Sequence, residues 1–139
     1  MSRAIDVKVC HVVIGILQNE QQEVLIALRV SHKIEPNVWE FPGGKVEPHE
    51  TLENALIREF QEEIGITILK ATSFLKTEKE TDEFKLLLHT FRIVNYTGHP
   101  HGKENQLIRW VPIDALNNFV FPKANAPIIS KLLCMINQI

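Results

Sequence analysis

Two glutamates in the segment 51–64 lie where a helix would place apolar residues, and a third lies beside them. At about 100° per residue, the apolar stripe through Leu56 continues onto Glu59 and Glu63, with Glu62 about 60° to one side. An acid-rich helix ordinarily has its carboxylates in solvent, opposite the leucines. This segment places them on the apolar side, so we expect Glu59 and Glu63 to face inward.

Carboxylates packed this closely need a compensating partner. At about 4 Å and an effective dielectric near 20, each pair repels by roughly 4 kcal/mol. Protonation would remove that repulsion, and so would bound cations; hard divalent ions with oxygen ligands, Mg²⁺ or Mn²⁺, suit such a site best. Mg²⁺ held by carboxylates commonly completes its shell with phosphate and water. The glutamates therefore favour metal-dependent phosphate chemistry.

The elements that position these residues can be read from the hydrophobic pattern. Pro48 and Thr51 open the helix, and Gly65 closes it as the residue just past its end. We expect strands over 7–17, 23–30, 66–76, 84–96 and 106–111, helices over 51–64 and 125–137, and loops over 31–44, 77–83 and 97–105. This irregular alternation predicts an α/β (α+β) fold, with a mixed β-sheet sandwiched between α-helices.

The segment 44–66 resembles the Nudix box. Its defined positions are Gly44, then Glu50 after five residues, then Arg58-Glu59 after seven more, followed by Glu62-Glu63 and Gly65. So many matches over 23 residues are far more specific than a short glycine motif. The stretches 39–44, 102–104 and 121–125 also resemble MutT-like Nudix hydrolases. The resemblance implies the Nudix fold and one Nudix domain over 1–139.

The resemblance assigns catalytic and metal-binding roles position by position. Arg58 would orient the catalytic glutamates, and Glu50 would hold the loop against the helix. On its own, an acid in the glycine- and histidine-rich loop 97–105 is usually a surface residue, and only the family match makes Glu104 a candidate. The general base stays open between Glu59 and Glu104. The implied metal ligands are the backbone carbonyl of Gly43 and the carboxylates of Glu59, Glu62, Glu63 and Glu104.

Substrate-binding positions follow from the same resemblance. Gly43 and Gly44 would let the backbone approach metal and phosphate without a Cβ clash, although a Gly-Gly pair alone more often marks a plain turn. MutT-like enzymes can carry an arginine where this chain has Phe84, so the contacts made by the loop around Glu83 and Phe84 differ here. The implied substrate-binding residues are Arg29, Phe41, Gly43, Gly44, Lys45, Phe84 and Asn125.

Asn125 has two interpretations. It stands two residues before Pro127, where an asparagine commonly caps a helix. Alternatively, its amide reads a base: oxidation of guanine at C8 places a hydrogen on N7, so an edge with two acceptors becomes donor–acceptor. One amide offers the complementary acceptor and donor. The match of residues 121–125 to MutT-like enzymes favours base recognition.

The resemblance implies Mg²⁺-dependent hydrolysis of 8-oxo-dGTP to the monophosphate and pyrophosphate, with Mn²⁺ as a substitute metal, which would keep oxidised guanine out of DNA. Two alternatives stay open. One is a Nudix hydrolase for another nucleoside diphosphate derivative, such as a dNTP, ADP-ribose or a dinucleoside polyphosphate. The other is a non-catalytic, nucleotide-binding regulator, which the complete set of box carboxylates disfavours.

Composition excludes several other classes of protein. The 139 residues carry 15 Lys+Arg against 17 Asp+Glu, a net charge of −2, so binding of a nucleic-acid polymer through its phosphates is not expected. Two cysteines are too few for a disulfide framework, and no apolar run approaches the roughly 20 residues of a membrane span. We expect a cytoplasmic, monomeric protein whose partner is a small nucleotide substrate.

Overall fold

A computed structural model describes residues 8–29 and 37–136. Predicted elements also reached Val7, Val30, residues 31–36 and Asn137, which lie outside the described residues. The strands are β1 (Lys8–Ile16), β2 (Glu23–Leu28), β3 (Trp39–Glu40), β4 (Gly43–Lys45), β5 (Thr67–Glu80), β6 (Phe84–Thr97) and β7 (Ile108–Pro112). The helices are α1 (Leu52–Glu63), the short 3₁₀ helices η1 (Ile113–Asn118) and η2 (Lys123–Asn125), and α2 (Ala126–Ile136).

The strands form two sheets. The larger sheet has the order β4-β1-β6-β5; β1 and β6 run parallel, and the other two pairings are antiparallel. The second sheet, in the order β3-β2-β7, is antiparallel throughout. The predicted mixed sheet is therefore confirmed, and a smaller sheet accompanies it.

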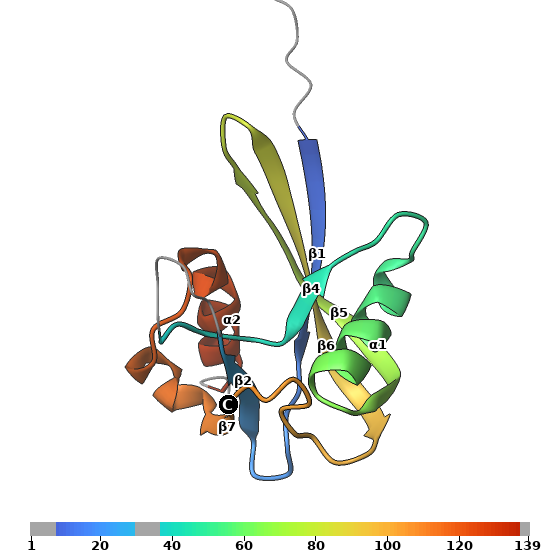
Figure 1. Cartoon of the computed structure of the whole chain (residues 1–139). Helices are drawn as coiled ribbons and strands as arrows, with labels where there is room; N and C mark the ends of the chain where they lie inside the picture. The colour runs from blue at the N-terminus through green and yellow to red at the C-terminus, as the bar shows by residue number, and fades with distance from the viewer. Residues whose placement is uncertain (1–7, 30–36, 137–139) are drawn as a thin grey trace, which may run out of the picture.

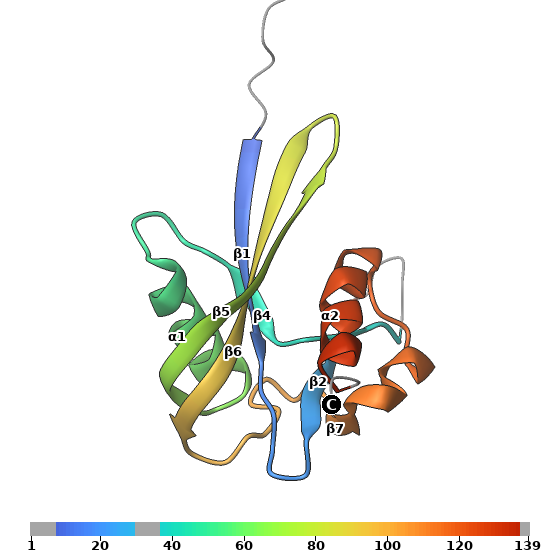
Figure 2. The same ribbon diagram turned by 180° about the vertical axis from the view of Figure 1, so that it is seen from behind.

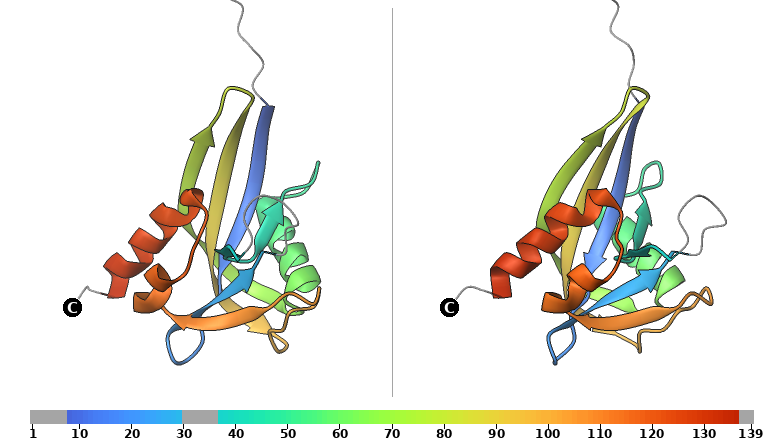
Figure 3. Two further views of the ribbon diagram at one scale, coloured as in Figure 1. Left: turned by 60° about the vertical axis from the view of Figure 1, so that its left-hand side comes forward. Right: turned by 90° about the vertical axis from the view of Figure 1, so that its left-hand side faces the viewer.

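The two α-helices cover opposite faces of the larger sheet, as predicted. In Figure 3 the strands β1, β5 and β6 pass between α2 on one side and α1 on the other. The β5–β6 hairpin and the start of β1 project beyond both helices (Figures 1 and 2). No helix in the described part of the chain is long and apolar enough to cross a membrane.

Side-chain alternation along β1 gives each face its own core. Val13 packs in the cluster beneath α1 with Phe60, whereas Ile14 packs in the cluster beneath α2 with Ile128. All four side chains are buried. This follows from the period of two in a strand, whose successive side chains point to opposite faces. The buried second half of β1, residues 13–16, thus contributes to both cores.

Two predicted loops contain strands. Residues 37–44 of the predicted loop 31–44 hold β3 and the first two residues of β4, and β5 continues through Glu80 into the predicted loop 77–83. The charged end of β5 remains a strand because β5 is an edge strand, where charged side chains are tolerated. Glu78 there pairs with Lys85 of β6 at 3.1 Å. Hydrophobic patterning missed this stretch because it contains too few apolar residues.

Candidate active site

Helix α1 begins and ends close to the predicted residues. The Thr51 side chain accepts a hydrogen bond from the backbone N–H of Asn54 at 3.1 Å, which caps the first turn. At the other end Gly65 has φ +74°, and its N–H donates to the carbonyl of Phe60 at 2.9 Å. A left-handed glycine of this kind is a common helix terminator, so the helix stops immediately after Glu63.

The glutamates of α1 differ in their surroundings. Glu59 and Glu63 are half-buried on the side facing β4, whereas the side chain of Glu62 is 54% exposed. The backbone N–H of Gly43 in β4 donates to Oε2 of Glu63 at 3.2 Å. Helical spacing therefore identified the inward pair correctly, and it placed Glu62 to one side, as observed.

The Gly43-Gly44 pair has a packing role beyond that of a turn. It forms most of β4, with Gly44 opposite Val13 of β1 in the antiparallel register. A Cβ atom on Gly44 would overlap the carboxylate of Glu59, and one on Gly43 would overlap the carbonyl oxygen of Val13. A side chain at Gly43 would push against the backbone of β1, and one at Gly44 would displace the Glu59 carboxylate, so the two glycines let backbone contact both inward carboxylates.

Arg58 ties the loop before α1 to the site. Its Nε and Nη2 donate to the two carboxylate oxygens of Glu50 at 2.7 and 2.9 Å, and Nη2 also donates to the carbonyl of Lys45 at 3.0 Å. Its Nη1 donates to Oε1 of Glu59 at 3.0 Å. These bonds raise the pKa of Arg58 and lower the pKa of Glu50 to about 2, chiefly through the bond between them. Arg58 thus has the contacts that an orienting role requires.

Negative charge is concentrated around Glu63. Burial, followed by the charges of Glu59, Glu40 and Glu104, raises the pKa of Glu63 to about 8. Burial is also the main cause that raises the pKa of Glu59, against the opposing effect of Arg58. A nearby cation would favour the ionised form of both groups. The site therefore has the electrostatic character of one that a divalent cation stabilises.

Glu104 is held near Glu63 by the loop after β6. The backbone N–H of Lys103 and Nε2 of Gln106 both donate to the carbonyl of Glu63, each at 2.9 Å, and Lys103 Nζ donates to the carbonyl of Gln61 at 3.2 Å. These donors satisfy carbonyls that the end of a helix leaves unpaired. Glu104 itself is exposed, close enough for its charge to act on Glu63.

The acidic donors suit a hard divalent cation in chemistry, since all of them are carboxylate oxygens. Within residues 8–29 and 37–136, however, no three His, Cys, Asp or Glu side chains already form a metal-binding group. Glu59 is engaged with Arg58, and Glu62 extends into solvent, so side-chain rotation would have to bring the ligands together. The metal-ligand assignments stay predictions.

A cavity of about 540 Å³ opens beside these carboxylates. It includes six of the predicted substrate-binding residues, and it adds an acid, two lysines and an apolar wall that were not predicted. Its lining consists of Val12, Ile14, Arg29, Glu40, Phe41, Gly43, Gly44, Lys45, Lys79, Leu86, Leu88, Pro122, Lys123, Ala124 and Asn125.

Phe84 is the predicted substrate-binding residue that does not line this cavity. It opens β6 near the tip of the β5–β6 hairpin and is 39% exposed. Leu86 and Leu88, further along the same strand, line the cavity instead. A position matched from the family sequence therefore lies beyond the cavity in this chain.

Sequence reasoning missed Glu40 and Lys79. Oε2 of Glu40 accepts a hydrogen bond from Nη2 of Arg29 at 3.0 Å within an ion pair, and the charge of Glu40 contributes to the raised pKa of Glu63. Its place just before Phe41 in the stretch matched to the family could have identified it. Lys79 was assigned to a loop, so no pattern connected it with the site.

Asn125 is buried, with 6% of its surface exposed. It ends η2, and its backbone N–H donates to the carbonyl of Pro122 at 2.9 Å. Asn125 lines the cavity, and its side-chain oxygen Oδ1 is buried and has no hydrogen-bond partner among the described residues. The interpretation as a side-chain cap of α2 is therefore wrong, because a cap would accept a backbone N–H there. A buried acceptor without a partner is costly unless a ligand supplies a donor.

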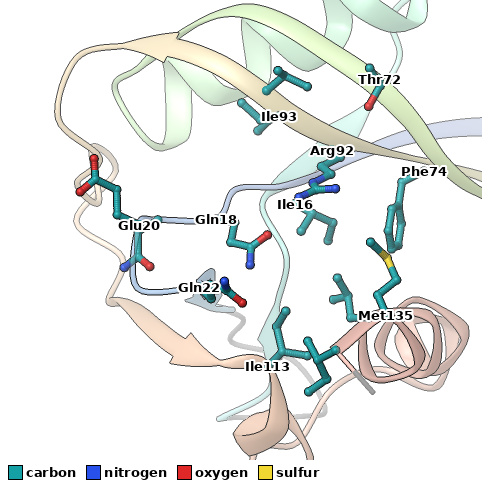
Figure 4. A pocket seen from close by; sticks show the side chains of 14 residues that line it. Ile16, Gln18, Glu20, Gln22, Thr72, Phe74, Arg92, Ile93, Ile113 and Met135 are labelled. Atoms are coloured by element: carbon teal, nitrogen blue, oxygen red, sulfur yellow. The ribbon is translucent and has the colours of Figure 1, made fainter. Parts of the chain in front are cut away.

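A larger cavity, of about 790 Å³, lies elsewhere, between the β1–β2 turn, the larger sheet and the end of α2. Figure 4 shows its polar rim, which includes Gln18 and Gln22, and its apolar wall, which includes Phe74 and Met135. The inward glutamates of α1 do not line it. The larger of these two cavities is therefore not the one beside the acidic site.

Comparison with known proteins defines the class of this molecule. The NUDIX domain family matches residues 10–132, and the chain belongs to this family of hydrolases. Nudix hydrolases generally need a divalent metal ion.

Individual relatives show which members of the family this chain is similar to. The chain is 40% identical over 125 residues to the 8-oxo-dGTP diphosphatase of Escherichia coli K12, and the aligned region covers 90% of this chain and 97% of the relative. It is 27% identical to the CTP pyrophosphohydrolase of the same organism, over 92% of this chain and 94% of the relative. A solved structure from work on MutT of Aliivibrio salmonicida and Vibrio cholerae superposes with a TM-score of 0.80 at 40% identity, covering 92% and 99% of the two chains.

Proposed function

We propose that this chain hydrolyses 8-oxo-dGTP to 8-oxo-dGMP and pyrophosphate, with Mg²⁺ as the metal and Mn²⁺ as a substitute, and so removes an oxidised precursor of DNA. The observation that carries the proposal is the buried Oδ1 of Asn125, an acceptor with no partner in the described part of the chain. The identity to 8-oxo-dGTP diphosphatases over most of the chain supports it.

The oxidised base supplies the donor that Asn125 lacks. In 8-oxoguanine N7 carries a hydrogen, which can bond to Oδ1, and the neighbouring O6 accepts from the amide nitrogen. Ordinary guanine presents a lone pair at N7 instead, so Oδ1 would face another acceptor and stay unpaired. Sites built to pair a specific polar group can discriminate by roughly 10⁴ or more.

The carboxylates of α1 and of Glu104 support the hydrolysis step. Mg²⁺ held by Glu59, Glu62, Glu63, Glu104 and the Gly43 carbonyl would neutralise phosphate oxygens and lower the pKa of water. Glu59, or Glu104 as the alternative, accepts the proton of the attacking water. The water oxygen bonds to the β-phosphorus, and the bond from that phosphorus to the α–β bridging oxygen breaks, which releases the monophosphate. Arg58 keeps Glu59 in place through the 3.0 Å hydrogen bond.

A second candidate substrate is CTP. The amino group at C4 of cytosine is a donor beside the acceptor N3, so it can pair with the same asparagine amide. The relative named CTP pyrophosphohydrolase makes this the leading alternative. Both candidates satisfy Oδ1, and a direct comparison of substrates separates them.

The test measures kcat/KM for 8-oxo-dGTP, dGTP, CTP and ADP-ribose with Mg²⁺. We expect 8-oxo-dGTP to exceed dGTP by orders of magnitude and Asn125→Ala to reduce that ratio at least tenfold. Asn117→Ala, the same change at an exposed residue of η1, serves as the matched control and should leave the ratio unchanged. Equal values for dGTP and 8-oxo-dGTP would refute the proposal, and no turnover of any substrate would favour a nucleotide-binding regulator. The monomeric state and the cytoplasmic location stay predictions.

A further inference from the structure

Strand β5 contributes a polar edge to the cavity that holds Asn125. In the β5–β6 register Lys79 lies opposite Leu86, and Thr77 lies opposite Leu88. Directly paired residues of antiparallel strands project to the same face, so both β5 residues lie on the face whose leucines line the cavity. Lys79 lines the cavity as well, from a segment where no strand was expected.

The floor between the two polar edges is apolar. Val12 and Ile14 of β1 and Leu86 and Leu88 of β6 line the cavity from adjacent strands. A flat, apolar surface of this kind suits the face of a nucleobase, with hydrogen-bonding groups around its rim. Asn125 provides one such group, from η2.

Two features show that the β5 edge has free hydrogen-bonding capacity. The hydroxyl oxygen of Thr77 is buried and has no hydrogen-bond partner among the described residues. Within that part of the chain Lys79 takes part in no ion pair, whereas the neighbouring Glu78 is paired with Lys85. Lys79 is exposed and lines the cavity at the edge of its apolar floor, so its ammonium group is free to donate to an acceptor on a bound ligand.

Lys79 and the glutamates expected to bind the phosphates lie near opposite edges of the larger sheet. The inward glutamates contact Gly43 and Gly44 of β4, at one edge of the larger sheet, and Lys79 lies on β5 at the opposite edge. Three strand spacings separate the two edges, roughly 14 Å at about 4.8 Å for each step. A triphosphate bound at the carboxylates therefore directs its base, rather than its terminal phosphates, toward Lys79.

We propose that Lys79 is a specificity-determining residue, whose ammonium group donates a hydrogen bond to the oxygen that oxidation adds at C8 of guanine. The inference rests on the proposed function. Lysine is a donor only, and once Asn125 has paired with N7–H and O6, the acceptor left on that edge is O8. Ordinary guanine has a C–H group at C8, which accepts nothing. Lys79 and Asn125 thus recognise different atoms of the same lesion.

The test compares Lys79→Met with Lys76→Met. Lys76 lies on the same strand but opposite His89, on the other face of the sheet, so its loss removes the same charge without touching this cavity. We expect Lys79→Met to lower kcat/KM for 8-oxo-dGTP roughly 10- to 100-fold with little change for dGTP, because a charge-assisted hydrogen bond is lost from one substrate only. Lys76→Met should leave both values unchanged, and Lys79→Arg should restore part of the preference.

Other outcomes overturn the inference in identifiable ways. An equal loss of kcat/KM for both nucleotides in Lys79→Met would mean that Lys79 contacts a phosphate, the sugar or O6, since dGTP has those groups as well. An unchanged ratio would mean that Lys79 does not contact the base. The melting temperature of each variant is measured in parallel. If Lys79→Met has a folding defect, Lys79→Arg alone is compared with the wild-type protein. If wild-type protein itself shows no preference for 8-oxo-dGTP, the proposed function fails, independently of the variant.

Discussion

Replacing Glu63 with glutamine should stabilise the metal-free protein while it removes activity. The pKa of Glu63 rises from 4.5 to about 8 through burial and neighbouring acids, so the folded state binds a proton that the unfolded state releases. The unfolding free energy must therefore fall as pH rises from about 4.5 toward 8. Glutamine resembles the protonated carboxyl group and carries no charge at any of these pH values. The unfolding free energy of Glu63→Gln should therefore not show this decrease.

The magnitude follows from the size of the pKa change. At about 1.4 kcal/mol for each tenfold change in proton affinity, the move from 4.5 to about 8 corresponds to about 5 kcal/mol as an upper limit. Glu63 is half-buried, and water and side-chain rotation screen part of this cost. We expect the variant to gain about 1–3 kcal/mol at pH 8.5 and almost nothing at pH 4.5. For a domain of this size each kcal/mol raises Tm by about 3–4 °C.

The assay is urea and thermal denaturation in EDTA at several pH values, followed by circular dichroism. Glu62→Gln is the matched control, because the same chemical change occurs one residue away on a side chain that is 54% exposed. It should alter stability by less than about 0.5 kcal/mol at every pH. A gain in Glu63→Gln that is equal at pH 4.5 and 8.5, or no gain at all, would refute the electrostatic reasoning.

Added Mg²⁺ extends the same experiment to the metal. If Glu63 is a ligand, millimolar Mg²⁺ should raise the Tm of wild-type protein at pH 8.5, because a ligand of the folded state stabilises that state. The rise should be much smaller in Glu63→Gln, and kcat of that variant should fall by orders of magnitude. Equal stabilisation of both proteins by Mg²⁺ would show that Glu63 does not bind the metal.

Two further predictions concern the packing at β4 and a buried histidine. Gly44→Ala should displace the carboxylate of Glu59 and lower kcat roughly 10- to 100-fold with the fold retained; full activity would contradict the overlap described above. Burial and the neighbouring His11 lower the pKa of His89, whose Nε2 lies 3.0 Å from Nδ1 of His11. The unfolding free energy should therefore decrease as pH falls below about 6.5, and His89→Gln should flatten that slope in urea titrations. His99→Gln, at an exposed position, should leave the slope as it is.

The sequence by itself determined the local features of this protein. Helix α1 and its inward carboxylates follow from spacing and from the residues at its ends, because helical periodicity and capping are properties of neighbouring residues. The resemblance of residues 44–66 to the Nudix box is likewise local. Family membership, confirmed over residues 10–132, was therefore accessible before any coordinates.

Tertiary structure decided which residues from distant segments meet. Glu40 acts on Glu63 across 23 positions of sequence, and Lys79 reaches the cavity because β5 continues into a stretch that reads as a loop. Edge strands tolerate charged residues, so their hydrophobic pattern is weak. The end of β5 is therefore recognised as a strand only from its pairing with β6. The choice between a helix cap and a free acceptor at Asn125 was also tertiary, since it depends on burial and on the absence of a local partner among the described residues.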